Sequence, residues 1–402
     1  MILFTLILLM PFLFGCAQCG DESNVRSRYE VVSVGKAFEK KSKVCLSEYA
    51  SAMDYVPLET APECMLPGER QLQVRSFEDR LYFYDEMQSF SAKKSAPLCF
   101  KSDGSFISLI GSIGKSDNEF MYVKGMMIDA SKRQLVILDY NRFLFHTLDG
   151  EFIRYADVGI NSVFKFFIFC AENQGYIFLT NPSILDDEYR GSDLLVKVDY
   201  NGIERSKFSL KRKSCSKVSK KGILKGSVGS GLFQSSGNIY LYMPNDTLYR
   251  VEPENMNFKA EFFIDFGKYA TKEREGAKLY APRNKLFVTS DFVALTAQFT
   301  YSSFPEIEKE YILSNFVYDR KKGTTRALEY NDDYGYAGFT NDIDGGMLFY
   351  PKYMNEGKMY QLVDAIDFIE YAQKSNSQKM KEVAATLTDE SNPVVVVATL
   401  KE

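Results

Sequence analysis

The stretch Leu98-Cys-Phe-Lys-Ser-Asp-Gly-Ser-Phe-Ile107 consists of two short strand-like runs joined by a tight turn. Asp103-Gly104 stands at the turn, and this pair tolerates the positive φ angles that a two-residue hairpin requires. The same arrangement recurs at Asp149-Gly150 and at Asn201-Gly202, and a weaker copy turns at Lys322-Gly323. The sequence therefore predicts a repeated antiparallel unit of strand, turn and strand.

A second kind of segment, a β-branched and aromatic run that follows a polar turn, accompanies these hairpins. Six such runs occur, at residues 80–85, 133–139, 175–179, 237–242, 291–295 and 346–350. They recur at intervals of roughly 40 to 60 residues, which fits one four-stranded propeller blade per unit. No helix alternates with the strands, so a parallel α/β sheet is disfavoured. We expect an all-β, six-bladed β-propeller; a double β-sandwich, the main alternative, would not require six similar units.

One short helix is predicted near the C-terminus. Apolar residues recur on one face of residues 365–372 at helical spacing, with Asp and Glu between them. Asn392-Pro393 ends the helical region, and residues 394–398 read as a strand. We expect this terminal strand to close the ring by pairing with an early strand such as residues 55–59, because closure removes the sheet edges that invite aggregation.

The N-terminal residues 1–15, MILFTLILLMPFLFG, are uncharged and almost wholly apolar. This run is too short for a membrane-spanning helix but fits the apolar core of a signal peptide. It ends at Cys16, in a setting that resembles the lipobox at which bacterial lipoproteins are cleaved and acylated. We therefore expect a lipoprotein signal peptide over 1–15, lipidation of Cys16, a flexible tether over 16–40 and the propeller over 41–402. An ordinary secretory peptide with an incidental cysteine is the alternative.

The composition limits the partners and cofactors. The formal net charge is -4, which gives no reason to expect nucleic acid as a partner. The chain has one histidine, and no CxxC pair occurs in its body, so we expect no metal site and no cofactor. With no tryptophan in the chain, WD40 repeats are disfavoured. We expect a monomer.

Four segments occur in an order that is found in one known family: residues 55–60 (YVPLET), 110–120 (IGSIGKSDNEF), 341–346 (NDIDGG) and 392–396 (NPVVV). Over nearly all of its mature part, the chain resembles the six-bladed β-propeller lipoproteins of gut Gram-negative bacteria. One departure is Asp117-Asn118, where Gly-Pro is often found. The resemblance implies an outer-membrane lipoprotein, on the periplasmic or the cell-surface side, that works beside nutrient-uptake systems. It implies no particular activity.

Candidate ligand-binding residues lie in the C-terminal third. Residues 341–346 do not form a calcium loop, since Pro351 falls where the bidentate Glu belongs. Asp342 and Asp344 either hold a turn through backbone N–H groups or project toward the propeller axis and touch a ligand. Residues 329–336, EYNDDYGY, mix carboxylates with tyrosines, a composition that suits sugar binding; a solvated loop is the alternative. The candidates in this segment are Asp332, Tyr334 and Tyr336.

Residues 207–225 are rich in Lys and contain no acidic residue. They lie between the third and fourth strand units, where we expect a long solvated loop. The alternative is a site for an anionic glycan or a phosphate, for which Lys211, Arg212 and Lys213 are the candidates.

No catalytic motif stands out. The single histidine, His146, lies in no Ser-His-Asp pattern, and neither a Gly-rich phosphate loop nor a nucleophile elbow is present. We therefore favour a membrane-anchored binding propeller for a glycan or an envelope protein. The alternative is a glycan-active hydrolase or lyase with an axial site of carboxylates and tyrosines.

Overall fold

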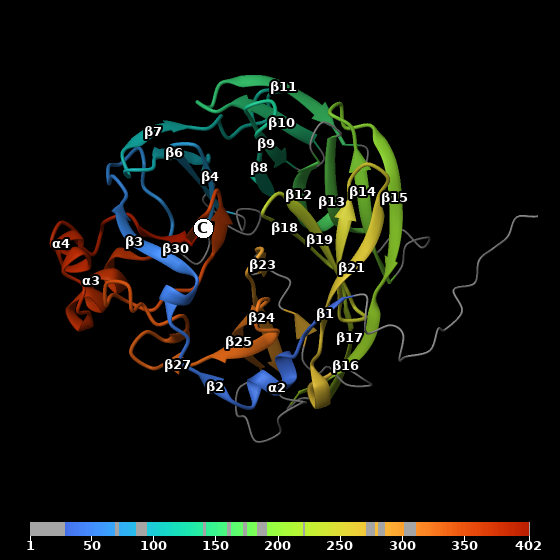
Figure 1. Cartoon of the computed structure of the whole chain (residues 1–402). Helices are drawn as coiled ribbons and strands as arrows, with labels where there is room; N and C mark the ends of the chain where they lie inside the picture. Colours follow the sequence, from blue (N-terminus) through green and yellow to red (C-terminus); the bar gives the residue numbers. More distant parts are fainter. Residues whose placement is uncertain are drawn as a thin grey trace, which may run out of the picture.

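The computed structural model describes residues 29–401, except 69–71, 86–94, 140–141, 159–161, 172–174, 183–190, 220–221, 271–277, 280–285 and 301–310. Six antiparallel sheets stand around one axis as the blades of a propeller (Figure 1). The predicted six-bladed, all-β fold is confirmed. The predicted signal peptide, residues 1–15, and Cys16 lie outside the described residues.

In blades 1 to 3, four consecutive strands follow one another from the axis outward (Figure 1). Blade 1 contains β4 (Leu72–Phe77), β5 (Arg80–Asp85), β6 (Leu98–Lys101) and β7 (Phe106–Leu109). Blade 2 contains β8 (Gly125–Asp129), β9 (Gln134–Asp139), β10 (Arg142–Thr147) and β11 (Phe152–Asp157). Blade 3 contains β12 (Ser162–Ala171), β13 (Gly175–Pro182), β14 (Ser192–Val198) and β15 (Glu204–Lys211).

Blades 4 to 6 have the same core order with additions. Blade 4 contains β18 (Gly231–Ser235), β19 (Asn238–Met243), β20 (Thr247–Glu252) and β21 (Asn257–Ile264). In blade 5, β22 (Lys278–Leu279) and β23 (Leu286–Val288) both pair with β24 (Phe292–Thr300), and β25 (Tyr311–Asp319) and β26 (Thr324–Leu328) follow. Blade 6 contains β29 (Tyr353–Asn355), β30 (Lys358–Val363), β31 (Val394–Leu400) and β3 (Ala50–Pro57).

The ring is closed in blade 6, where strands from both ends of the chain meet. β31 pairs antiparallel with β30 on one side and with β3 on the other, and Tyr55 lies opposite Val396. The predicted pairing of the terminal strand with an early strand is confirmed. Just before β31, the buried Asn392 side chain donates to the carbonyls of Glu59 and Cys64 and accepts from the Leu66 N–H. This amide therefore fastens the segment after β3 to the closing strand.

The predicted C-terminal helix is present but is divided into α3 (Ala365–Lys374) and α4 (Gln378–Ala384). The division falls at Ser377, whose hydroxyl accepts the Met380 N–H and so caps α4. Phe368 on α3 is buried and packs edge-on against Tyr55 of β3, with ring centroids 5.6 Å apart. Both helices are inserted between β30 and β31, so they belong to the closing blade. Among the described residues, no helix is both long and apolar enough to cross a membrane.

Residues 29–49 form a strap along the outside of the later blades. β1 (Glu30–Val32) pairs in parallel with β21 of blade 4, α2 (Val34–Phe38) follows, and β2 (Lys41–Ser42) pairs in parallel with β26 of blade 5. The ring of Phe38 stacks on that of Phe299 at 3.8 Å. Residues 30–40, predicted as part of a flexible tether, are therefore packed on the body. The sequence pattern of β1, α2 and β2 is weak because each element is short and is stabilised by contacts with the blades rather than by its own residues.

The turn glycines of the first three blades are held against the preceding blade. Gly104, Gly150 and Gly202 have φ of +94°, +98° and +79°, as their predicted turns require. A Cβ on them would lie 2.1, 2.6 and 2.2 Å from the carbonyl oxygens at the ends of β3, β7 and β11. A side chain at these positions would collide with the neighbouring blade. The glycines of the Asp-Gly and Asn-Gly pairs are therefore required by the packing between blades as well as by the turn.

We expect Gly104→Ala to lower the free energy of unfolding by about 3 kcal/mol, the sum of a positive-φ penalty of about 1–2 and an overpacking penalty of about 1–3 kcal/mol. The matched control is Gly323→Ala. Gly323 has φ of +62° but no atom within 4 Å of an added Cβ, so we expect only the conformational penalty. Urea unfolding of the two variants measures the difference. An equal decrease in the free energy of unfolding for both variants would show that the added methyl group at Gly104 causes no destabilising clash with the neighbouring blade.

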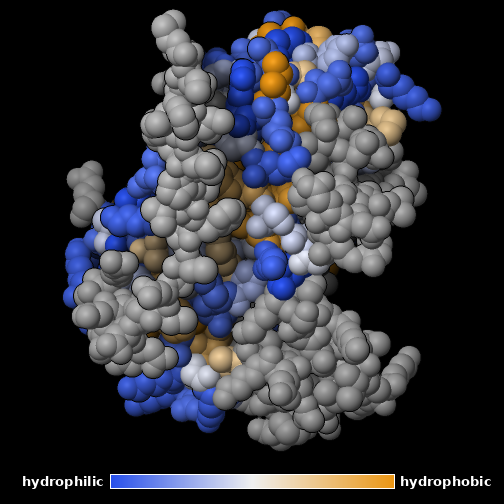
Figure 2. Space-filling view, turned by 90° about the vertical axis from the view of Figure 1, so that its right-hand side faces the viewer, coloured by the Kyte–Doolittle hydropathy of each residue, from blue (hydrophilic) through white to orange (hydrophobic). Residues whose placement is uncertain are grey.

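The strand order places the long connections together. In blades 1 to 5, tight turns join the third strand to the fourth at one end of the sheet. In every blade, the connection between the second and third strands, and the connection to the next blade, lie at the other end. Near blade 6 these are residues 329–352, which join β26 to β29, and residues 364–393, which carry α3 and α4. On the side of the molecule seen in Figure 2, much of the described surface is hydrophilic, and apolar residues show at the upper edge and toward the middle. The two long connections near blade 6 build the site described next.

Candidate functional site

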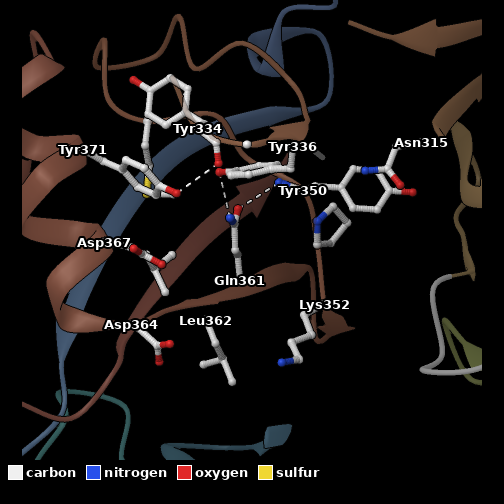
Figure 3. Close-up of a pocket in the computed structure, with 14 residues that line it drawn as sticks. Asn315, Tyr334, Tyr336, Tyr350, Lys352, Gln361, Leu362, Asp364, Asp367 and Tyr371 are labelled. Atoms are coloured by element: carbon white, nitrogen blue, oxygen red, sulfur yellow. Dashed lines mark hydrogen bonds between the residues drawn. The ribbon is translucent and has the colours of Figure 1, made fainter. Parts of the chain in front are cut away.

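A pocket with a volume of about 310 Å³ lies where blade 5, blade 6 and α3 meet (Figure 3). Its wall combines aromatic rings, side-chain amides and charged groups. The lining residues are Asn315, Tyr334, Gly335, Tyr336, Met347, Tyr350, Pro351, Lys352, Gln361, Leu362, Val363, Asp364, Asp367 and Tyr371.

A short hairpin and a helix supply the aromatic side of the pocket. β27 (Tyr330–Asn331) and β28 (Tyr336–Ala337) form the hairpin, whose turn contains Tyr334. The Asn331 side chain accepts the Asp333 N–H, and Gly335 has φ of +72°, so local chemistry shapes this turn. The Tyr334 ring meets the Tyr371 ring of α3 edge-on at 4.9 Å, and the Tyr371 hydroxyl donates to the Tyr334 carbonyl at 3.0 Å. The hairpin and α3 are thereby joined on this side of the pocket.

A hydrogen-bonded amide fixes the adjoining wall. Gln361 of β30 donates to the Tyr336 hydroxyl at 2.9 Å and accepts the Tyr350 N–H at 2.8 Å (Figure 3). The Tyr336 hydroxyl donates in turn to the Leu348 carbonyl at 2.5 Å. Because the Gln361 amide is held by two hydrogen bonds and the Tyr336 hydroxyl by two, both side chains have a fixed orientation in the absence of a ligand.

A second amide comes from blade 5. Asn315 of β25 donates to the Ala337 carbonyl at 2.7 Å, and its oxygen lies 2.7 Å from the Thr296 hydroxyl. The Thr296 hydroxyl also lies 3.3 Å from that of Tyr350, and burial raises the pKa of Tyr350 well above its usual value. The phenol of Tyr350 therefore stays neutral at all physiological pH values.

Charged groups line the remaining part of the pocket. Asp364 and Asp367 stand at the beginning of α3, and Lys352 comes just before β29. Burial raises the pKa of Tyr334, and the Asp333 carboxylate raises it further. The pocket thus offers neutral phenols, oriented amides, two carboxylates and one ammonium group.

The structure brings two of the three candidates from residues 329–336 into this pocket. Tyr334 and Tyr336 line it and are half-buried, whereas Asp332 is exposed on the same hairpin and is not among the lining residues. No pattern in the sequence indicated Asn315, Gln361, Asp364, Asp367 or Tyr371. Asp367 and Tyr371 lie on the predicted helix, but nothing in the sequence indicated which of its residues would face a pocket.

Asp342, which is exposed, and Asp344, which is partly buried, both accept hydrogen bonds from other segments of the chain. Asp342 accepts the backbone N–H and the hydroxyl of Ser47, at 2.9 and 2.5 Å. Asp344 accepts the Tyr55 hydroxyl at 3.1 Å and the Ser377 hydroxyl at 2.6 Å. The two carboxylates hold the strap, β3 and α4 to the segment before blade 6. Asp344 also accepts the Gly346 N–H at 3.1 Å, as the turn interpretation expects, whereas the bonds of Asp342 join distant segments and do not form a turn.

The basic segment between blades 3 and 4 is not the predicted loop. β15 extends to Lys211, and β16 (Lys213–Ser219) and β17 (Gly222–Val228) form a hairpin. Arg212 donates through Nε and an Nη nitrogen to Asp193, at 2.9 and 2.6 Å, so its charge is used in the fold. Lys211 is exposed, and the side chain of Lys213 lies outside the described residues. The prediction of a loop is wrong. A polar segment is compatible with a solvated loop and equally with two paired strands, so its composition did not distinguish between them.

The fold and the pocket together define a class: a six-bladed β-propeller whose closing blade carries a helical insertion and an aromatic pocket. The chain belongs to the family described as "Domain of unknown function (DUF4934)", which matches residues 29–399. No curated protein matches the chain significantly.

Solved structures share the fold at low sequence identity. A Bacteroides fragilis protein, named for its expected export from the cell, is 14% identical with a TM-score of 0.60, over 92% of this chain and 100% of that one. A member of the duf4221 family from Bacteroides vulgatus is 11% identical with a TM-score of 0.42, over 88% of this chain and 97% of that one. At such identities the first similarity supports the fold alone.

Proposed function

We propose that the protein is a membrane-anchored binding propeller of the bacterial outer membrane whose pocket between blades 5 and 6 holds a carbohydrate. The anchor is Cys16, at the end of the apolar residues 1–15. In this role the propeller captures a glycan beside a nutrient-uptake system. The side of the membrane, periplasmic or cell-surface, depends on sorting of the lipoprotein.

The chemistry of the pocket wall carries the proposal. The apolar face of a sugar ring packs on aromatic rings, which Tyr334, Tyr336 and Tyr371 supply, and sugar hydroxyls pair with planar polar groups such as Asn315 and Gln361. These amides are already oriented by hydrogen bonds, so binding costs little additional ordering. The volume, about 310 Å³, is at the small end of ligand pockets, which span about 300–1,000 Å³. One or two sugar units therefore fit better than a long chain segment.

A glycan-active hydrolase or lyase is the second candidate, and the presence of Asp364 and Asp367 in the pocket favours it. Glycosidases place their two carboxylates on either side of the bond that is broken. Here Asp364 is the N-cap and Asp367 lies in the first turn of the same helix, so both come from one side of the pocket, which favours binding over hydrolysis. Release of new reducing ends from oligosaccharides incubated with the protein would reverse this preference.

We expect Tyr334→Ala and Tyr371→Ala each to weaken glycan binding by about tenfold, since a lost aromatic contact is worth about 0.5–1.5 kcal/mol beyond its buried area. The matched control is Tyr330→Ala, because Tyr330 lies on the same hairpin but is exposed and outside the pocket lining. Calorimetric titration with neutral, amino and acidic oligosaccharides measures the effect. Equal losses in all three variants, or no binding by a folded wild-type protein, would contradict the proposal.

A further inference from the structure

We infer that the sugar held by this pocket is N-acetylated, and that its acetamido carbonyl accepts a hydrogen bond from Gln361. The inference rests on the proposed function and adds to it one substituent of the ligand. It follows from the hydrogen-bond donors and acceptors of the wall that Gln361 forms with Tyr350 and Asn315.

Gln361 has one N–H group that no described residue accepts. Its side-chain nitrogen carries two hydrogens, and its acceptor among the described residues is the Tyr336 hydroxyl, at 2.9 Å. The oxygen of the same amide is engaged separately, because it accepts the Tyr350 N–H at 2.8 Å. Gln361 lines the pocket although it is almost wholly buried. A ligand in the pocket is therefore in a position to accept the second N–H.

Asn315 has the same kind of unused donor. Its nitrogen donates to the Ala337 carbonyl at 2.7 Å, and its oxygen lies 2.7 Å from the Thr296 hydroxyl. One N–H of this amide is therefore also without an acceptor in the part of the chain that the structure describes. Figure 3 shows Tyr350 between the two amides, with Gln361 at its backbone N–H and Asn315 on the side of its hydroxyl. The wall thus presents two unused donors, one at each end of a tyrosine.

A carbonyl oxygen is the group that suits the unused N–H of Gln361. It accepts the N–H and brings no proton of its own, whereas a sugar hydroxyl brings a proton that needs an acceptor in turn. The acceptors beside this N–H are already bonded, because the Gln361 oxygen accepts from Tyr350 and the Tyr336 hydroxyl accepts from Gln361. An unused N–H is also less well tolerated in a buried site than an unused lone pair on a bonded oxygen. Among the substituents of sugars, the acetamido group supplies a neutral carbonyl of this kind.

A carboxylate would also accept the N–H, but it would bring a charge that the partners of this amide do not neutralise. A charge that leaves water in a recess has to be compensated by an opposite charge. The two hydrogen-bond partners of Gln361 are the Tyr336 phenol and the Tyr350 backbone N–H, and neither carries a positive charge. We therefore expect a neutral carbonyl here in preference to the carboxylate of a uronic acid.

The methyl of an acetamido group finds apolar neighbours in the same pocket. Met347, Pro351, Leu362 and Val363 line it together with the tyrosines. Contact with these side chains removes the methyl group from water, which adds to the affinity of an acetylated sugar. A sugar with a hydroxyl in place of the acetamido group would gain neither this contact nor the carbonyl bond.

The test compares two oligosaccharides that differ in this substituent. Oligomers of N-acetylglucosamine and of glucose, with the same linkage and length, are titrated calorimetrically into the full chain in detergent at neutral pH. We expect the acetylated oligomer to bind at least about tenfold more tightly, which corresponds to about 1.4 kcal/mol. An oligomer of a uronic acid is titrated as well, because Lys352 also lines the pocket.

Gln361→Glu removes both N–H groups of the amide and keeps an oxygen for the Tyr350 N–H. We expect this variant to bind the two neutral oligomers with about equal affinity. The matched control is Gln373→Glu, which adds the same charge at an exposed position of α3 outside the pocket lining and should preserve the preference. Circular dichroism shows whether each variant is folded, and the comparison of oligomers on the wild type decides the inference if Gln361→Glu does not fold.

Three outcomes would overturn the inference and leave the proposed function standing. They are equal affinity of the wild type for the two neutral oligomers, tighter binding of the acidic oligomer, and a preference that persists in folded Gln361→Glu. Absence of binding to every sugar by a folded wild-type protein would overturn both the inference and the proposed function.

Discussion

Deletion of residues 393–402 is expected to leave a protein that no longer unfolds in a cooperative transition. The deletion removes β31, the strand between β30 and β3 in the closing blade. Its residues 394–397 are four buried valines. Burial of one valine side chain contributes about 1.5–3 kcal/mol, so the four contribute about 6–12 kcal/mol, which is comparable with the total stability of about 5–15 kcal/mol of a typical domain.

The loss also opens the ring, because β3 then has no partner strand in blade 6. Urea unfolding followed by circular dichroism and by tyrosine fluorescence measures the effect. The control removes only Lys401 and Glu402, which lie beyond the strand; it loses the hydrogen bond from the Lys401 N–H to the Tyr49 carbonyl, worth about 1 kcal/mol. An unchanged midpoint in the ten-residue deletion would show that β31 does not close the fold.

The second large effect is a loss of stability in acid that depends on His146. This residue lies on β10 and is fully buried, and among the described residues neither ring nitrogen has a hydrogen-bond partner of normal geometry. The rings of Phe120 and Phe152 face it edge-on. Burial lowers the pKa of His146 from 6.5 to about 4, and the backbone of Leu144 opposes this only in part. The imidazole is therefore neutral in the folded protein at pH values at which it is protonated in the unfolded chain.

The direction of the pH effect follows from this difference. Above pH 6.5 the histidine is neutral in both states, so it adds no pH dependence. As the pH falls from 6.5 to about 4, the unfolded state takes up a proton that the folded state does not, and stability declines. The expected loss by pH 4 is about 3 kcal/mol, from about 1.36 kcal/mol per pKa unit.

The measurement is the free energy of unfolding from urea titrations between about pH 7 and pH 4, for the wild type and for His146→Leu. Titrating carboxylates affect both proteins, so the difference between them isolates the histidine. Leucine should remove about 3 kcal/mol of the decline at pH 4, and at pH 7 it should cost little because it replaces a polar ring without partners. Parallel curves would contradict the assignment.

Local sequence signals predicted the blades because strand periodicity and turn chemistry act over a few residues. The Asp-Gly and Asn-Gly pairs lie at positive-φ turns, and the valine-rich residues 394–398 form the closing strand. Where the local signal was ambiguous, the prediction failed. Residues 30–40 are packed as β1, α2 and the start of the segment to β2, and residues 213–228 form a hairpin, because contacts with neighbouring strands decide such short or polar segments.

The sequence by itself determined the six-bladed ring and its closure, and it singled out Tyr334 and Tyr336, which line the pocket. Only the tertiary structure brought them together with Asn315, Gln361 and Tyr371, because these residues come from two blades and an inserted helix. The tertiary structure also pairs Asp342 with Ser47 and Asp344 with Ser377, and it buries His146 where no described residue forms a hydrogen bond with its ring nitrogens. The physical reason is that backbone pairing follows from local patterns, whereas the neighbours of a side chain depend on how distant blades pack.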